Sequence, residues 1–442
     1  MKSLTLIIVL LLVATFGAAA MSFPERNPRI TIDGTLNCPY ISTDGGTVYL
    51  QISIKTSEML RPDRARRPMN IAVVLDRSGS MADERKMDYA KSALSKLIDQ
   101  LGSEDLFSLV VYDDVVDVLR SASRVGNKRD VKRLISDIYP RNSTNLGGGM
   151  MEGLQQAERN LGKAYVNRVI LISDGLANQG ITNPAELNSI ARRYRNKSIS
   201  LTTMGVGLDY NENLMIGLSE SGGGNYYFIE SPSQLAQIMN KELNSASAIV
   251  AQNATLDLTL GRGVRVLDVI GCERPSNSYS IPVGDLYANE TREFTVELSV
   301  PPGRGDFKVV SGVLRCDCGA LAGMPSFSTT IHYTHVTAEI ERNRNLDVQA
   351  KSDIALSTRR VENAMKALDE GRNEEAKREL DAAKQALVSS PAAAASGATA
   401  NSIHEQASRI DSYNKVVGDK DADLNRAKKA IQYENYQVQK KK

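Results

Sequence analysis

The sequence predicts an α/β fold in which a doubly wound, mostly parallel sheet is inserted in a β-sandwich and followed by a C-terminal helical tail. Between about Met69 and Ala246, short apolar runs alternate with amphipathic helical patterns, which is typical of a parallel sheet covered by helices on both faces. Strands of alternating polarity occur before and after this section. From about Asn345 onward, apolar residues recur at helical spacing.

A chain of 442 residues exceeds one ordinary hydrophobic core, so several domains are expected. We divide it into a signal peptide (1–20), the first strands of the sandwich (21–66), the α/β domain (67–246), the rest of the sandwich (247–342) and the helical tail (343–442).

The first twenty residues have the pattern of a secretory signal. Lys2 precedes an apolar segment that ends in small residues, and cleavage after Ala20 fits an Ala-x-Ala rule. An uncleaved membrane anchor is the alternative. No other stretch of the sequence is long and apolar enough to span a bilayer. We therefore expect an exported protein that is periplasmic, secreted or at the cell surface.

Export bears on the four cysteines, because disulfides persist in oxidising compartments. Four cysteines allow three pairings, and the sequence does not choose among them. A bridge from Cys38 to a later cysteine would staple together the segments that flank the α/β domain. Zinc binding at Cys316-x-Cys318 lacks a second well-spaced ligand pair. The four cysteines are Cys38, Cys272, Cys316 and Cys318.

The first clear strand covers Thr47 to Ile54, where alternate apolar residues share one face, as in a half-buried sandwich strand. An arginine- and proline-rich linker follows at 61–68. In the α/β domain, apolar periodicity predicts helices at 87–101, 128–138, 150–161, 184–194 and 231–243. Apolar runs predict strands at 71–75, 107–112, 169–172, 200–206 and 225–229.

The pattern changes again after Ala251. Strands of alternating polarity separated by Gly and Pro predict the remaining sandwich; they cover 255–260, 264–269, 292–300 and 327–336. Two helices meet at Gly371, and a second pair is predicted at 403–417 and 422–436. The Ala-, Ser-, Gly- and Pro-rich stretch 389–400 predicts a flexible linker. We expect the helical hairpin to pack on its own sandwich.

The strongest functional signal follows the apolar run Ile71 to Leu75. Asp76, Ser78 and Ser80 form an Asp-x-Ser-x-Ser motif directly after this predicted strand. Open α/β sheets bind ligands at the carboxyl ends of their strands. One carboxylate and two hydroxyls on a tight loop offer the oxygen donors that a hard cation such as Mg2+ prefers.

Two further stretches complete the pattern. Thr144 lies in a polar loop before a helix, and Asp174 follows a second buried strand in the sequence Ser-Asp-Gly. Asp76, Ser78, Ser80, Thr144 and Asp174 together resemble the metal-ion-dependent adhesion site (MIDAS) of von Willebrand factor A domains. The stretch 283–292 more loosely resembles bacterial von Willebrand A proteins related to the inter-alpha-trypsin inhibitor heavy chains.

The resemblance implies a cofactor and a partner. By the family's pattern, Ser78 and Ser80 bind Mg2+ directly, and Thr144 does so directly or through water. Asp76 and Asp174 lie close, often through water. Because few carboxylates touch the cation, it stays electrophilic and accepts an Asp or Glu of a protein partner as its last ligand. The sequence leaves open whether Mn2+ or Ca2+ replaces Mg2+.

Other classes of function lack support. The net charge is only +2, from 54 basic and 52 acidic residues, and Trp is absent, so no nucleic-acid partner is expected. The three histidines lie outside the α/β domain, no phosphate-binding loop is found, and we predict no enzyme. The alternative to adhesion is a cell-envelope scaffold whose metal site only stabilises the domain. Membrane contact is expected only through an uncleaved signal.

Overall fold

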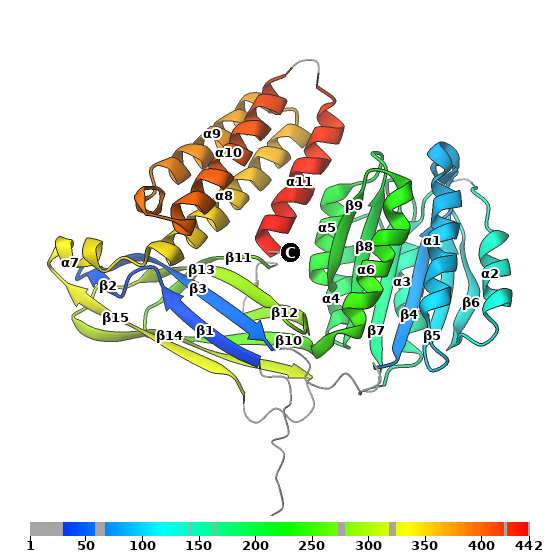
Figure 1. The fold of residues 1–442 in the computed structure, drawn as a ribbon, viewed down its shortest axis with the longest axis horizontal. Helices are drawn as coiled ribbons and strands as arrows, with labels where there is room; N and C mark the ends of the chain where they lie inside the picture. Colours follow the sequence, from blue (N-terminus) through cyan, green and yellow to red (C-terminus); the bar gives the residue numbers. More distant parts are fainter. Residues whose placement is uncertain are drawn as a thin grey trace, which may run out of the picture.

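The computed structural model describes residues 30–57, 67–141, 143–162, 165–272, 279–317, 324–419 and 422–440. The expected signal peptide and most of the arginine-rich linker therefore lie outside the described residues. Figure 1 shows three parts: an α/β domain, a β-sandwich beside it, and a helical bundle above the sandwich.

The α/β domain is built on a six-stranded sheet. Its strands are β4 (Met69–Asp76), β5 (Leu106–Tyr112), β6 (Val116–Arg124), β7 (Val166–Ser173), β8 (Ile199–Val206) and β9 (Gly223–Ile229). They are ordered β6-β5-β4-β7-β8-β9. All neighbours are parallel except β6, which pairs antiparallel with β5. Every residue of β4, β5, β7 and β8 is buried, as expected for strands covered on both faces.

Helices cover both faces of this sheet. One face packs against α1 (Lys86–Gln100), α2 (Lys128–Ser136) and α6 (Leu235–Ser247), which follows the short helix η2 (Pro232–Gln234). The other face packs against α3 (Leu146–Glu158), α4 (Pro184–Arg195) and α5 (Glu212–Ser221). A short helix, η1 (Gly79–Arg85), leads into α1. The doubly wound sheet predicted from the sequence is confirmed, although β6 and α5 were not predicted.

The sandwich consists of two sheets around a separate core. One is ordered β1-β3-β13-β11 and the other β12-β10-β14-β15-β2. The strands before the α/β domain are β1 (Ile30–Leu36), β2 (Tyr40–Ser42) and β3 (Gly46–Thr56). Those after it are β10 (Ile249–Leu260), β11 (Arg265–Ile270), β12 (Ser280–Tyr287), β13 (Thr291–Val300), β14 (Gly305–Asp317) and β15 (Ser326–Thr334).

The pairing of these strands establishes the insertion. Strand β3 pairs with β13, and β2 pairs with β15, so segments from both sides of the α/β domain share each sheet. The chain enters the α/β domain at the amino end of β4 and leaves at the carboxyl end of α6, which β10 follows directly. Both connections lie at the same edge of the parallel sheet. The carboxyl edge of the sheet lies on the opposite side from these two connections.

The tail is a helical bundle with its own core. After the short α7 (Thr337–Arg342), it comprises α8 (Leu346–Asp369), α9 (Asn373–Val388), η3 (Pro391–Ala394), α10 (Ala398–Gly418) and α11 (Leu424–Lys440). The predicted flexible linker at 389–400 is wrong: Ala392 is buried, and the hydroxyl of Ser390 hydrogen-bonds to Asp353 on α8. The alanine-rich segment is therefore packed against the helical bundle.

The tail contacts more than the sandwich on which it was expected to pack. Helix α8 lies on β3, β11 and β13, whereas α11 lies between the bundle and the α/β domain in Figure 1. Tyr436 of α11 is buried in the apolar core of the α/β domain, and its hydroxyl accepts a hydrogen bond from the backbone N–H of Tyr226 at 3.1 Å. One helix therefore joins the tail to the α/β domain.

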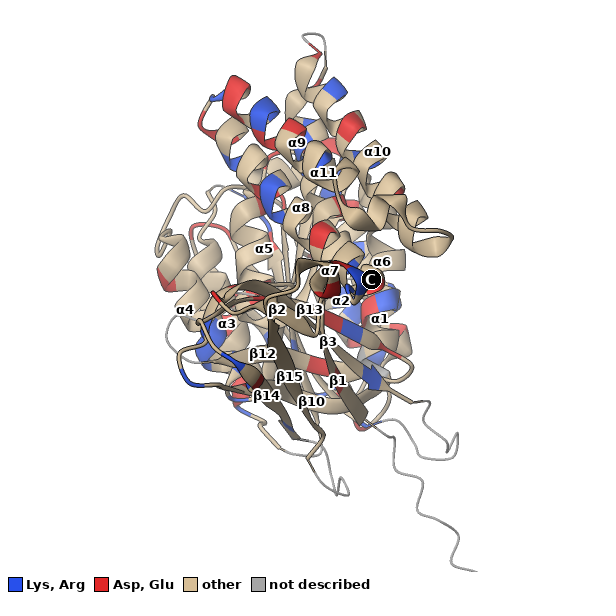
Figure 2. Ribbon diagram, turned by 90° about the vertical axis from the view of Figure 1, so that its left-hand side faces the viewer, with Lys and Arg blue, Asp and Glu red and all other residues tan. Residues whose placement is uncertain are grey.

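The described surface carries charges of both signs. Figure 2 shows Lys and Arg interspersed with Asp and Glu along the tail helices, without a continuous basic stripe on the side in view. Within the described residues, no helix is long and apolar enough to cross a membrane.

Candidate metal centre

The structure brings the predicted site residues to the carboxyl edge of the central strands. Asp76 is the last residue of β4, and Asp174 follows the last residue of its parallel neighbour β7. Thr144 lies in the loop before α3, whose N-terminus is capped by the side chain of Asn145. This placement follows from the parallel pairing, because adjacent parallel strands end at the same edge of the sheet.

Ser78, Ser80 and Asp174 form the closest group. The hydroxyl oxygens of Ser78 and Ser80 lie 3.2 Å apart, and the Ser80 hydroxyl donates to Asp174 Oδ1 at 2.9 Å. Neighbouring oxygens around octahedral Mg2+, at metal–oxygen distances near 2.1 Å, are separated by about 3.0 Å. The spacing of these oxygens therefore fits a small hard cation.

Asp76 lies behind the two serines and is held by three donors. Its Oδ1 accepts the backbone N–H of Ser78 at 2.8 Å, and its Oδ2 accepts hydroxyls from Ser173 at 2.7 Å and Tyr112 at 3.3 Å. Burial raises the pKa of Asp76 to about 6; these hydrogen bonds oppose the shift, and the charge of Asp174 adds to it. The carboxylate thus supplies negative charge from a fixed position.

Thr144 faces the same space across Gly175. A Cβ atom at Gly175 would lie 3.2 Å from the Thr144 hydroxyl oxygen and 3.7 Å from that of Ser80. The Thr144 backbone is fixed by Asn178, whose side-chain oxygen accepts the Thr144 N–H at 3.0 Å. Glycine after Asp174 therefore keeps a cradle open between the two hydroxyls.

Lys86, the first residue of α1, was not predicted as part of the site. It is buried, and its Nζ donates to Asp174 Oδ2 at 2.8 Å. Asp209 Oδ2 lies 3.8 Å from the same nitrogen but is largely exposed. Burial lowers the pKa of Lys86, but the neighbouring carboxylates outweigh burial and raise it. The sequence offered one signal, a lysine at the start of the helix that follows the Asp-x-Ser-x-Ser loop.

The five predicted residues offer two carboxylates and three hydroxyls. Nowhere in the described part of the chain do three or more His, Cys, Asp or Glu residues gather in a way that could hold a metal ion. Two carboxylates and three hydroxyl oxygens, with water to complete the coordination, suit Mg2+ or a similar hard cation. Such a set of residues fits a cation held loosely enough to take an external ligand.

The rim of this edge combines a charge cluster with exposed apolar side chains. Arg77 and Arg141 both pair with the buried Asp113, at 2.8 and 2.6 Å, and so tie the loops after β4, β5 and α2 together. Large apolar side chains on these loops and after Asp174 are more than half exposed; they are Val115, Tyr139 and Leu176. The rim of this edge therefore combines fixed ion pairs with exposed apolar surface.

The tail reaches the same edge through α11. The side chain of Asn425 donates to the backbone oxygen of Leu208 at 3.1 Å, and Lys429 donates to that of Tyr210 at 2.7 Å. Both acceptors lie in the loop after β8, which also carries Asp209. The helical tail therefore supports one wall of the candidate metal centre.

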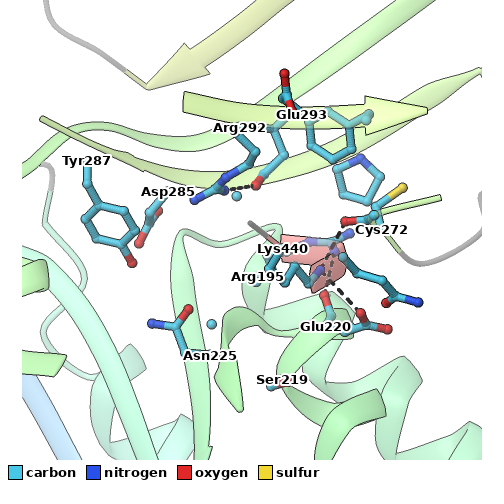
Figure 3. Close-up of a pocket in the computed structure, with 18 residues that line it drawn as sticks. Arg195, Ser219, Glu220, Asn225, Cys272, Asp285, Tyr287, Arg292, Glu293 and Lys440 are labelled. Atoms are coloured by element: carbon cyan, nitrogen blue, oxygen red, sulfur yellow. Dashed lines mark hydrogen bonds and ion pairs between the residues drawn. The ribbon is translucent and has the colours of Figure 1, made fainter. Parts of the chain in front are cut away.

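A pocket of the structure lies elsewhere, where α5, β9, the sandwich and the end of α11 meet (Figure 3). Its volume is about 40 Å³, room for only a few water molecules. Lys440 there pairs with Glu220 at 3.2 Å and donates to the Gly271 backbone oxygen at 3.1 Å. Its size and internal pairing make it a seam between domains and a poor fit for a substrate.

Two remaining sequence features have structural roles. Cys38 is a buried free thiol that donates to the backbone oxygen of Ile340 at 3.3 Å. The bridge from Cys38 across the inserted domain is therefore not formed, and Cys318 lies outside the described residues. His332 contacts Asp306, and His335 contacts Thr43, both within the sandwich region.

The fold of the α/β domain is that of a known class of protein module. Residues 70–241 match the family model of the von Willebrand factor type A domain, and this part of the chain is a von Willebrand factor type A domain. Domains of this family commonly mediate protein–protein interactions and are generally not enzymes.

Two solved structures share the wider architecture. A von Willebrand factor type A protein from Catenulispora acidiphila aligns with a TM-score of 0.73 and 17% identity over 95% of this chain and 98% of that one. The ArnB paralog VWA2 from Sulfolobus acidocaldarius aligns with a TM-score of 0.60 and 19% identity over 93% and 98%. At these identities the likeness concerns the fold alone.

Among curated sequences, YfbK of Escherichia coli is 27% identical over 239 residues, which is 52% of this chain and 42% of YfbK. The mouse inter-alpha-trypsin inhibitor heavy chain H3 is 24% identical over 43% of this chain and 23% of its own length. The chain thus matches less than half the length of each. The expected resemblance to heavy-chain relatives is confirmed.

Proposed function

We propose that this protein is an exported, metal-dependent protein-binding module of the adhesion type. Asp76, Ser78, Ser80, Thr144 and Asp174 would hold Mg2+, or Mn2+ or Ca2+ in its place, at the carboxyl edge of the sheet. A cation bound there supplies an electrophilic coordination position for the carboxylate of an Asp or Glu on a partner. The observation that carries the proposal is the spacing of the Ser78, Ser80 and Asp174 oxygens.

Each residue has a distinct task in this proposal. Ser78 and Ser80 would supply neutral hydroxyl oxygens, and a neutral donor leaves the cation more electrophilic than a carboxylate would. Asp76 and Asp174 provide charge from fixed positions. The exposed side chains of Val115, Tyr139 and Leu176 would contact apolar residues that flank the partner's acidic side chain.

The position of the site supports binding to an external partner. Both chain connections to the sandwich lie at the opposite edge of the sheet, so a partner at the carboxyl edge would not meet them. Export rests on the apolar sequence that ends at Ala20. The mass of the protein purified from its native host tests it, because cleavage would remove the first twenty residues.

Calorimetric titration of Mg2+ and Mn2+ into the purified chain tests the site. Ser78→Ala removes a proposed ligand whose hydroxyl lies 3.2 Å from that of Ser80 in the loop after β4, so the fold should persist. We expect at least about tenfold weaker metal binding, since one of six ligands is lost. Ser92→Ala, an exposed change on α1, is the matched control. Equal affinities in Ser78→Ala and wild type would refute the assignment.

A structural scaffold of the cell envelope is the second candidate. The contacts of α11 with both the bundle and the α/β domain favour it, because they join the parts into one body. A partner survey by pull-down with and without EDTA separates the two. Adhesion predicts partners that are lost with EDTA, and scaffolding predicts partners that are retained.

A further inference from the structure

The position of Lys86 in the candidate metal centre has a consequence for how the site binds. A buried ammonium pairs with Asp174, one of the two carboxylates of the proposed site. Asp174 uses both of its oxygens, one for Lys86 and one for Ser80. Removing Lys86 would leave a buried carboxylate without its cation, which is costly in a folded protein.

The chain is built locally to place this lysine. Glu84 and Arg85, directly before it, both have left-handed backbone conformations, with φ of 49° and 57°. Non-glycine residues rarely adopt this conformation, and two in succession are strained. Gly207, with φ of 74°, lies opposite: a Cβ atom there would come within 3.1 Å of Lys86 Cε. Both features bring the start of α1 into the site.

We propose that Lys86 sets the charge of the metal centre so that a bound divalent cation still requires an anionic partner. Asp76 and Asp174 together would neutralise a divalent cation completely. Lys86 adds one positive charge, so the loaded centre carries a net charge of +1. The carboxylate of a partner brings this sum to zero. Asp209 changes it little, because its side chain is 72% exposed and its charge is screened.

Lys86 thereby acts as a positioning and specificity residue. It weakens metal binding in the absence of a partner and strengthens the coupling between the metal and a carboxylate. Because such coupling is reciprocal, a carboxylate ligand must raise the metal affinity by the factor by which the metal raises carboxylate affinity. The inference rests on the proposed function, and it adds a chemical reason why the ligand must be acidic.

Titration of Mn2+ into the full chain, with and without acetate as the carboxylate probe, tests the proposal. In wild type, acetate should raise the affinity for Mn2+. In Lys86→Met we expect about 10- to 100-fold tighter Mn2+ binding without acetate, because a positive charge within a few ångström is lost. Acetate should no longer strengthen it. Lys96→Met, on the exposed face of the same helix, should behave like wild type.

A second readout does not depend on the loaded site. In EDTA, Lys86→Met should melt at a lower temperature than wild type and Lys96→Met, because Asp174 loses its buried partner. Addition of Mn2+ should raise the melting temperature of Lys86→Met by more than it raises that of wild type. Lys86→Gln, which can still donate to Asp174, serves if Lys86→Met fails to fold. A folded variant with unchanged metal affinity and acetate dependence overturns the inference alone. Wild type that binds no Mn2+, with or without acetate, overturns the proposed function as well.

Discussion

Arg168 is the residue whose replacement should most disturb the joint between the α/β domain and the sandwich. Its guanidinium, on β7, pairs with Glu242 of α6 and donates to Asp285 at 3.2 Å and Tyr287 at 3.1 Å on β12. The side chains of Arg168 and Glu242 are 1% and 0% exposed. Arg168→Met would keep a long apolar side chain in place but remove the guanidinium that pairs with two buried carboxylates.

The structure sets the size of the effect. Breaking a buried ion pair by removing one partner costs about 3–5 kcal/mol. Glu242 would retain three neutral donors, at 2.7 to 2.8 Å, which places the loss near the lower end, about 3 kcal/mol. Arg124→Met is the matched control, because Arg124 and its partner Glu104 are 63% and 62% exposed. Exposed pairs contribute about 0–1 kcal/mol.

Urea unfolding followed by circular dichroism measures both variants. Arg168→Met should unfold at lower urea, and its transition should split, because the sandwich and the α/β domain lose a shared anchor. The two parts have separate apolar cores, so each can unfold in its own transition. A single transition, shifted no further than that of Arg124→Met, would refute the assigned role of this network.

Three further outcomes are expected. Burial alone would raise the pKa of Glu242, but the charge of Arg168 and three hydrogen bonds lower it from 4.5 to about 2. The lowered pKa contributes about 3 kcal/mol to the free energy of unfolding; this contribution is complete above pH 4.5 and is lost as the pH falls toward 2. Urea unfolding measured across that pH range should show the loss. Gly175→Ala places a methyl group against the Thr144 hydroxyl and should weaken Mn2+ binding by calorimetry with little change in melting temperature; unchanged affinity would argue against the cradle. Tyr436→Phe leaves a buried backbone N–H of β9 without its acceptor and should cost about 1–2 kcal/mol, measured by urea unfolding; an equal effect from the exposed Tyr139→Phe would contradict it.

Much of the fold was predictable because its signals are local. The strands of the sheet are continuous apolar runs, and the helices between them repeat apolar residues at helical spacing. The elements missed have weaker patterns: β6 is an edge strand with no residue fully buried, and α5 follows β8 after a short loop. The linker predicted at 389–400 failed because alanine and serine are compatible with both mobile and tightly packed segments.

The sequence by itself determined which oxygens would gather at the candidate metal centre. A strand that ends in Asp76 and a parallel neighbour followed by Asp174 must bring the two residues to one edge of the sheet. The cation, the partner and export remain proposals drawn from that pattern and its family resemblance.

Only the tertiary structure placed Lys86 against Asp174, 88 residues away, and Arg168 against Asp285, 117 residues away. It alone placed α11 on the α/β domain. Periodicity reveals which face of an element is buried, but it does not tell which distant charge or element will meet that face. Such pairs form because a buried charge needs a partner wherever the packing of whole elements brings one within reach.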